Sequence, residues 1–176
     1  MSSWKKVKET VVHQGYRGIS QKRFEMPNGQ LMDFDIVTNE VYVTIAAFTP
    51  EKAAILVRQF RPGPEQMLVS FPEGALEEGE SAIEAGRREL LEETGYQAGT
   101  IEILKTFRSA YTTEKQICLL ALDCQKMTSQ NLDESEYIEV FTLPLVDFRH
   151  YLRDKNDEAF TNVDAAYLAL DRMDSL

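Results

Sequence analysis

The sequence lacks the features that would place it in several common classes of protein. Its 176 residues include only two cysteines and two histidines. Cys118 and Cys124 form neither a CxxC pair nor a disulfide framework, and both lie in or near apolar, strand-like patterns. We therefore expect two buried, reduced thiols. His13 and His150 stand alone, so the sequence offers no cluster of the kind that holds zinc.

Long apolar runs and an excess of positive charge are also missing. No run of 18 apolar residues occurs, and the N-terminus has no apolar core typical of a secretory signal. There are 29 acidic and 19 basic side chains, which give a formal charge of −10. This balance argues against binding to nucleic acid or to anionic membranes. We expect a cytoplasmic protein with one domain, or with one domain and a terminal extension.

Glutamate is abundant in one segment, where its spacing is informative. Glu89, Glu92 and Glu93 follow an i, i+3, i+4 pattern, which places their carboxylates on one face of a helix. Like charges at this spacing repel each other by a few tenths of a kcal/mol per pair. A hard divalent cation such as Mg²⁺ would turn that repulsion into coordination. Taken alone, the three residues also fit an ordinary solvated acidic helix.

The same segment carries signals for the start and end of a helix. Ser81 and Glu84 fit a capping box, and Gly95 is suited to the left-handed conformation that ends a helix. The sequence therefore predicts a helix over about 82–94, preceded by a glycine-bearing loop over 74–79.

The rest of the chain is dominated by patterns typical of β-strands. Strands are predicted over 4–12, 16–26, 31–38, 41–48, 53–60, 67–71, 101–107, 117–122 and 137–142; a loop over 126–136; and helices over 146–153 and 157–173. This order predicts an α/β fold, with a mixed sheet covered by helices on both sides and preceded by β-hairpins. We divide it into a β-rich segment, 1–45, and a main domain, 46–176.

The spacing of the glycine- and glutamate-rich segment resembles a known signature. Counted from Gly74, it continues with Glu80 six positions later, then Arg88-Glu89-Leu90, then Glu92-Glu93, and closes with Gly95. This matches the Nudix signature at each fixed position, and only Tyr96 replaces a residue that is usually aliphatic. The resemblance implies an α/β/α Nudix sandwich. It also implies hydrolysis of a nucleoside diphosphate linked to another moiety, with Mg²⁺ as cofactor and Mn²⁺ as a possible substitute.

Shorter pieces, at 26–29, 57–62, 71–74 and 139–141, resemble the ADP-ribose and ADP-sugar pyrophosphatase branch of this family. That likeness implies that ADP-ribose or a nucleotide sugar is cleaved to a nucleoside monophosphate and a sugar phosphate. It also implies a homodimer to which segment 1–45 contributes.

One loop departs from this branch. Ala110-Tyr111 stands where the branch usually has proline, and a tyrosine at a similar distance past the motif is a loose mark of dinucleoside polyphosphate hydrolases. Hydrolysis of dinucleoside polyphosphates or nucleoside triphosphates is therefore the alternative. A non-catalytic nucleotide-binding regulator is a third hypothesis, which the intact set of motif glutamates disfavours. A packing aromatic is the alternative role for Tyr111.

The resemblance assigns metal-binding roles residue by residue. Glu89 and Glu93 correspond to the main metal ligands, Glu92 to an additional one, and residue 73 supplies a backbone carbonyl. Glu93 is for this reason also placed among the catalytic residues. Glu73 is unusual, because smaller residues are more common at its position.

Further roles fall to residues around the metal ligands. Glu80 and Arg88 are expected to orient the ligands, since arginine can hold carboxylates in a bidentate fashion. Arg61 corresponds to an arginine that contacts substrate phosphate. An ordinary surface ion pair is the alternative for Arg88 and Arg61.

Two glutamates compete for the role of general base. Glu114 lies in the predicted loop before the strand 117–122, and Glu136 lies just before the strand 137–142. Residues 109–114 align with the family's loop pattern, which slightly favours Glu114. A solvated loop glutamate remains the alternative for each.

Overall fold

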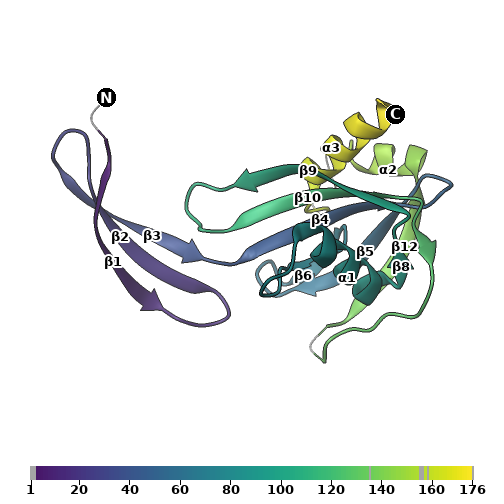
Figure 1. The fold of residues 1–176 in the computed structure, drawn as a ribbon, viewed down its shortest axis with the longest axis horizontal. Coiled ribbons are helices and arrows are strands. Elements are labelled where there is room, and N and C mark those ends of the chain that lie inside the picture. Colours follow the sequence, from purple (N-terminus) through teal and green to yellow (C-terminus); the bar gives the residue numbers. More distant parts are fainter. Residues whose placement is uncertain (1–2, 135, 155–156, 158, 176) are drawn as a thin grey trace. The chain divides into compact units, whose positions relative to one another are not determined.

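The computed structural model describes residues 3–134, 136–154, 157 and 159–175. The chain divides into two compact units. The first contains Met1–Val41 and Phe107–Gln116, and the second contains Tyr42–Thr106 and Ile117–Leu176. Figure 1 shows the elements of both units.

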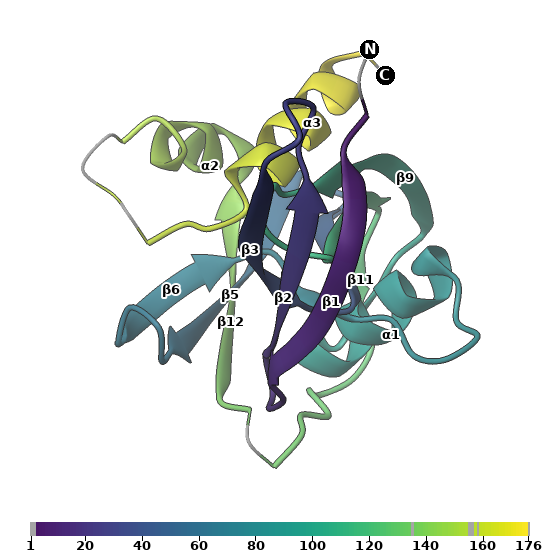
Figure 2. The same ribbon diagram turned by 90° about the vertical axis from the view of Figure 1, so that its left-hand side faces the viewer.

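The first unit is built on a three-stranded antiparallel sheet. It consists of β1 (Lys5–His13), β2 (Gly18–Glu25) and β3 (Leu31–Thr38), in the order β1-β2-β3 (Figure 2). The rings of Trp4, Phe24 and Phe34 meet edge to face, with centroids 6.0 to 6.3 Å apart. Val37 of β3 also forms a parallel bridge with Thr112, so the segment 107–116 joins this unit.

Most of a seven-stranded sheet belongs to the second unit. Its strands are β4 (Val41–Phe48), β5 (Ala53–Arg61), β6 (Gln66–Ser70), β7 (Glu73–Ala75), β9 (Thr100–Arg108), β10 (Lys115–Leu122) and β12 (Ile138–Pro144). The order is β12-β5-β4-β10-β9, while β6 pairs with β5 and β7 pairs with β4. A small second sheet joins β8 (Tyr96–Gln97) to β11 (Gln125–Lys126).

Helices cover both faces of the large sheet. The helix α1 (Ala82–Thr94) packs on one face, and α2 (Leu145–Tyr151) and α3 (Val163–Asp174) pack on the other (Figure 1). Side chains of β4 alternate between these two layers, because successive residues of a strand point to opposite faces. Ile45 joins Leu90 of α1 in one buried cluster, whereas Phe48 packs against Phe71 and Phe148.

A glycine sets the distance between α1 and the sheet. A Cβ atom on Gly86 would lie 2.3 Å from Cδ1 of Leu119, so a larger residue here would force this buried leucine to move. The structure thus confirms the predicted α/β fold, with a mixed sheet between helices and an N-terminal β-extension.

Several predicted boundaries were wrong. The predicted loop 74–79 includes most of strand β7, and β8 and β11 were missed because strands of two residues carry no recognisable pattern. The helix predicted over 157–173 begins only at Val163. The amide of Val69 bonds to the carbonyl of Ala159 at 2.9 Å, and Thr161 bonds back to Val69 at 3.0 Å, so pairing with β6 replaces the helical bonds. Position 158 of that predicted helix lies outside the described residues.

Two further expectations can be compared with the structure. Cys118 and Cys124 are buried and free, as predicted. None of the helices formed by the described residues is both long and apolar enough to cross a membrane.

Candidate active site

The helix that carries the three glutamates begins and ends where the sequence predicts. The Ser81 hydroxyl accepts a hydrogen bond from the amide of Glu84, and the Glu84 carboxylate accepts one from the amide of Ser81. At the other end, Gly95 adopts φ 71° and its amide bonds to the carbonyl of Leu91 at 2.7 Å. These caps satisfy backbone groups that a helix leaves unpaired, and they fix the ends of α1.

Two carboxylates of α1 lie against strand β7. Glu93 is only 5% exposed, and its Oε2 accepts a hydrogen bond from the backbone amide of Glu73 at 3.1 Å. Glu89 lies directly beside Gly74, where a Cβ atom would come within 2.0 Å of the Glu89 carboxyl group. A residue larger than glycine at position 74 would therefore force the Glu89 carboxylate to move away from the strand.

The surroundings of these carboxylates disfavour negative charge. Burial raises the pKa of Glu89, partly offset by hydrogen bonding and charge attraction from Arg88. Burial also raises the pKa of Glu93 well above its usual value, and the charges of Glu89, Glu73 and Glu136 add to this effect. Among the causes of the raised pKa of Glu89 and of Glu93, the charge of Glu136 is the smallest.

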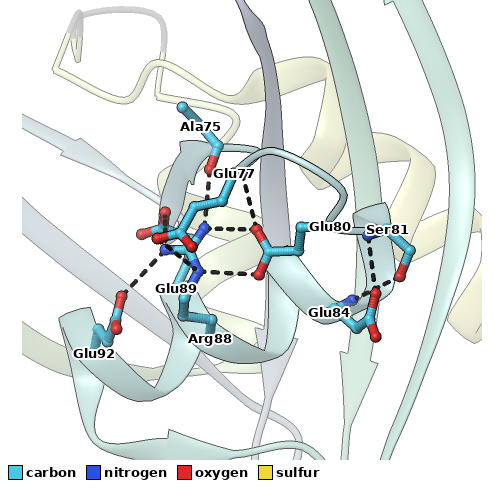
Figure 3. Close-up of polar contacts among 8 residues, drawn as sticks. All are labelled: Ala75, Glu77, Glu80, Ser81, Glu84, Arg88, Glu89 and Glu92. Carbon is cyan, nitrogen blue, oxygen red and sulfur yellow. Dashed lines mark hydrogen bonds and ion pairs between the residues drawn. The ribbon is translucent and has the colours of Figure 1, made fainter.

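Arg88 balances part of this charge (Figure 3). Its Nε and Nη2 donate to the two oxygens of Glu80 at 3.0 and 2.9 Å, and Nη1 donates to Glu89 at 2.8 Å and to Glu92 at 3.2 Å. Nη2 also donates to the carbonyl of Ala75 at 3.0 Å, which ties the arginine to β7. The bond to Glu80 is the main cause of the raised pKa of Arg88 and of the lowered pKa of Glu80. Arg88 thus fixes the direction of the Glu89 and Glu92 carboxylates.

The donor set suits a hard divalent cation. Carboxylate and carbonyl oxygens are the ligands that Mg²⁺ and Mn²⁺ prefer. Buried Glu93 and half-buried Glu89 present such oxygens, and the charge of Glu89 adds to the raised pKa of Glu93. Glu92 is more peripheral, with a side chain that is 39% exposed. Within the described part of the chain, no three acidic, histidine or cysteine side chains already converge as a complete cage. The side chains present nevertheless fit the predicted metal by their chemistry.

Arg61 also contacts β7, in a network that the sequence only partly predicted. Its Nη2 donates to Oε1 of Glu73 at 2.6 Å, and Nδ2 of Asn162 donates to Oε2 of Glu73 at 3.0 Å. Asn162 is only 4% exposed, and its Oδ1 accepts from the amide of Phe71 at 2.8 Å. Sequence reasoning missed Asn162 because it fell inside a predicted helix, although an asparagine before a helix is a familiar N-cap signal.

The segment that leads to Glu136 is attached to the C-terminal end of α1. The Gln130 side chain donates to the carbonyls of Glu93 at 2.7 Å and of Ile138 at 3.0 Å, and the amide of Asn131 donates to the carbonyl of Glu92 at 2.9 Å. The segment thereby satisfies carbonyls that a helix end leaves unpaired. It holds the start of β12, two residues after Glu136, next to the helix that carries the three glutamates.

Glu114, the other candidate base, belongs to the N-terminal unit. Within that unit its Oε2 accepts hydrogen bonds from Arg17 at 3.0 Å and from Asn39 at 2.6 Å. The second unit therefore brings together all the predicted site residues except Glu114, which has its own partners in the first.

Comparison with known proteins identifies the fold and its chemistry. Residues 38–163 match the NUDIX domain. The chain is 33% identical over 134 residues to a methanol dehydrogenase activator of Bacillus methanolicus, covering 74% of this chain and 72% of that protein. It is 35% identical over 126 residues to an ADP-ribose pyrophosphatase of Bacillus subtilis (strain 168), covering 70% and 68%. A crystal structure of an ADP compounds hydrolase superposes with a TM-score of 0.85 at 27% identity, over 98% of this chain and 95% of that one.

The domain match spans most of the chain and contains α1, β7 and the carboxylates between them. The fold, the signature, which is matched at each fixed position, and the relatives agree with one another. The chain belongs to the Nudix family and is a hydrolase that acts on pyrophosphate bonds.

Proposed function

We propose that this protein is a Mg²⁺-dependent pyrophosphatase that cleaves ADP-ribose or a related nucleotide sugar to a nucleoside monophosphate and a sugar phosphate. The observation that carries the proposal is a pair of carboxylates that lie against β7: buried Glu93, which accepts from the Glu73 amide, and half-buried Glu89, which accepts from Arg88. The relatives named for ADP-ribose and for ADP compounds support this class of substrate.

The metal would be held by residues of α1 and β7. Glu89 and Glu93 are the principal ligands in this proposal, with Glu92 and the backbone carbonyl of Glu73 as further ones. When bound, Mg²⁺ or Mn²⁺ neutralises phosphate charge, orients the phosphates and acidifies a water molecule. Arg88 keeps Glu89 and Glu92 turned toward a common region, which lowers the cost of organising the site.

Glu136 is our preferred general base, although the loop pattern in the sequence slightly favours Glu114. Its charge contributes to the raised pKa of both Glu89 and Glu93, and Gln130 ties its segment to the Glu93 carbonyl of α1. Glu114 is instead engaged by Arg17 and Asn39.

Matched amide variants distinguish the two glutamates. Loss of a general base typically costs about 10²- to 10⁴-fold in rate. We expect Glu136→Gln to lower kcat by about a hundredfold or more, and Glu114→Gln to change kcat by less than about fivefold. The reverse order would assign the base to Glu114.

Arg61 supplies positive charge for the phosphate groups. Its guanidinium lies beside Glu73 on β7, and its side chain is 36% exposed, so a ligand can approach it. Arginine suits this task because its donors match phosphate oxygens in pairs.

The choice of substrate is tested by comparing kcat/KM for ADP-ribose, nucleotide sugars, diadenosine tetraphosphate and nucleoside triphosphates. We expect ADP-ribose or an ADP-sugar to be preferred. A tenfold advantage of diadenosine tetraphosphate or a triphosphate, about 1.4 kcal/mol in transition-state binding, would contradict this choice of substrate. Because the Tyr111 side chain is exposed, Tyr111→Pro would then show whether its loop sets the preference.

The protein is further proposed to be a homodimer in which segment 1–45 contributes to the interface. The N-terminal sheet carries exposed apolar side chains, among them Trp4, Val11 and Leu31. Such a surface is typical of an association site, and the acidic chain offers no sign of a membrane or nucleic-acid partner. Light scattering should give a mass near twice 20.1 kDa. A monomer at micromolar concentration would contradict the dimer without affecting the assigned chemistry.

A further inference from the structure

The side chain of Glu73 is held at both of its oxygens. Oε1 accepts from Nη2 of Arg61 at 2.6 Å, and Oε2 accepts from Nδ2 of Asn162 at 3.0 Å. The three residues come from the end of β5, from β7 and from the start of α3, so the network joins segments far apart in the chain. An exposed ion pair alone would leave the arginine mobile, whereas a carboxylate anchored at its second oxygen fixes the position of the first.

Asn162 is fixed in a single orientation by a backbone group. Its Oδ1 accepts from the Phe71 amide at 2.8 Å, and an amide N–H can only donate. The Nδ2 group must therefore point to Glu73, where a carboxylate can only accept. Because Asn162 is buried, this alignment has little freedom to change.

We propose that Glu73 and Asn162 are a positioning pair that holds the Arg61 guanidinium in place for the phosphate groups of the substrate. Asn162 anchors Glu73, and Glu73 anchors Arg61. The inference rests on the phosphate-binding role of Arg61 in the proposed function. It adds two residues that determine substrate binding, one of them contributed by the C-terminal helix region.

The backbone and the side chain of Glu73 serve different partners. The backbone amide donates to the Glu93 carboxylate at 3.1 Å, while the side chain contacts Arg61 and Asn162. A change in the side chain leaves the amide in place. Loss of the positioning pair should consequently raise KM for the substrate and leave kcat nearly unchanged. A general loss of structure would instead lower kcat or the amount of active protein.

A reciprocal exchange of groups provides the test. In Glu73→Gln, the new NH₂ must face one of two donors, either the NH₂ of Asn162 or the guanidinium of Arg61. In Asn162→Asp, two carboxylates face each other. The double variant restores complementary partners, because the new amide at position 73 donates to the new carboxylate at position 162, which still accepts from the Phe71 amide. Glu139→Gln is the matched control, since it removes the carboxylate that pairs at 2.9 Å with Arg58 on the same strand, β5.

Steady-state kinetics with ADP-ribose and Mg²⁺ should show a rise in KM of about fivefold or more in each single variant, with kcat within about twofold. The double variant should return KM to within about twofold of wild type, and Glu139→Gln should not change it. Thermal unfolding of each variant confirms that it is folded. If Asn162→Asp does not fold, Glu73→Gln and the double variant still form a complete comparison.

Three results would contradict the proposal that Glu73 and Asn162 position Arg61. They are an unchanged KM in Glu73→Gln, a loss confined to kcat, and a double variant no better than Glu73→Gln alone. Failure of the proposed function is recognised separately, because wild-type protein would then not cleave ADP-ribose or any nucleotide sugar. A wild type that turns over normally beside variants with normal KM would refute the positioning pair alone.

Discussion

Arg88 and Arg61 both contact the short strand β7, but they differ in the number of carboxylates that they bind and in how exposed their side chains are. Arg88 contacts Glu80, Glu89, Glu92 and the Ala75 carbonyl, and its side chain is 24% exposed. Arg61 pairs with Glu73, and its side chain is 36% exposed. In the proposed function, Arg88 organises acidic side chains, whereas Arg61 is held by Glu73 for contact with the substrate phosphates.

The proposed metal-binding carboxylates of α1 should matter more for activity than either arginine. We expect Glu93→Gln to lower kcat by at least about a hundredfold, because it removes a principal ligand of the ion that activates water. Glu78→Gln, a change at an exposed glutamate of the neighbouring loop, is the control and should have little effect. Near-normal turnover of Glu93→Gln with Mg²⁺ would contradict the assignment of Glu93 as a metal ligand.

Arg88→Ala should produce the next largest effect. Residues that orient metal ligands typically contribute about 10- to 100-fold in activity or metal affinity, so we expect a loss within that range. When activity is measured against Mg²⁺ concentration, the variant should need more Mg²⁺ for half-maximal activity and should reach a lower maximal rate. A variant with unchanged activation would mean that Arg88 forms only a surface ion pair.

Arg61→Ala should differ in kind as well as in size. Loss of a hydrogen bond to a charged group costs about 1.5–3 kcal/mol, so KM for ADP-ribose should rise by about tenfold or more, while the Mg²⁺ dependence stays normal. If this variant instead resembled Arg88→Ala, the contrast between the two arginines would be lost.

The smallest effect concerns stability without metal. Burial raises the pKa of Glu93 in the folded protein, so the folded state binds more protons than the unfolded state above the unfolded pKa. This contribution to stability is fully present below the unfolded pKa and is lost as pH rises through the folded one. Glu93→Gln should therefore stabilise the metal-free protein more at about pH 8 than at about pH 5.

Thermal unfolding in a chelator measures this difference. Each kcal/mol recovered raises Tm by about 2–4 °C in a protein of this size. A difference between variant and wild type that did not change with pH would show that the Glu93 carboxylate is not penalised by burial.

Local features of the site could be predicted from sequence because local bonds create them. Ser81, Glu84 and Gly95 fix α1 through contacts within one or two turns, and the predicted helix, 82–94, is the one observed. The spacing of Glu89 and Glu93 likewise places them on one side of that helix. Gly74 could be recognised from the signature, although its reason, the Glu89 carboxylate lying against it, is visible only in three dimensions.

The missed features depend on contacts between distant residues. Asn162 reaches Phe71 and Glu73 across about ninety positions, and residues 159–161 pair with β6 instead of starting α3. No local pattern reports such contacts. The choice between Glu114 and Glu136 was open in the sequence for the same reason, since each lies in a loop whose neighbours are set by the fold.

The most direct test of the account is the fate of ADP-ribose with and without divalent metal. Wild-type protein treated with a chelator should lose its activity, and Mg²⁺ should restore it, with AMP and ribose 5-phosphate as the phosphorus-containing products in ³¹P NMR. Full turnover in the chelator, or cleavage that leaves the pyrophosphate bond intact, would contradict the assignment of the α1 carboxylates as a metal-dependent pyrophosphatase site.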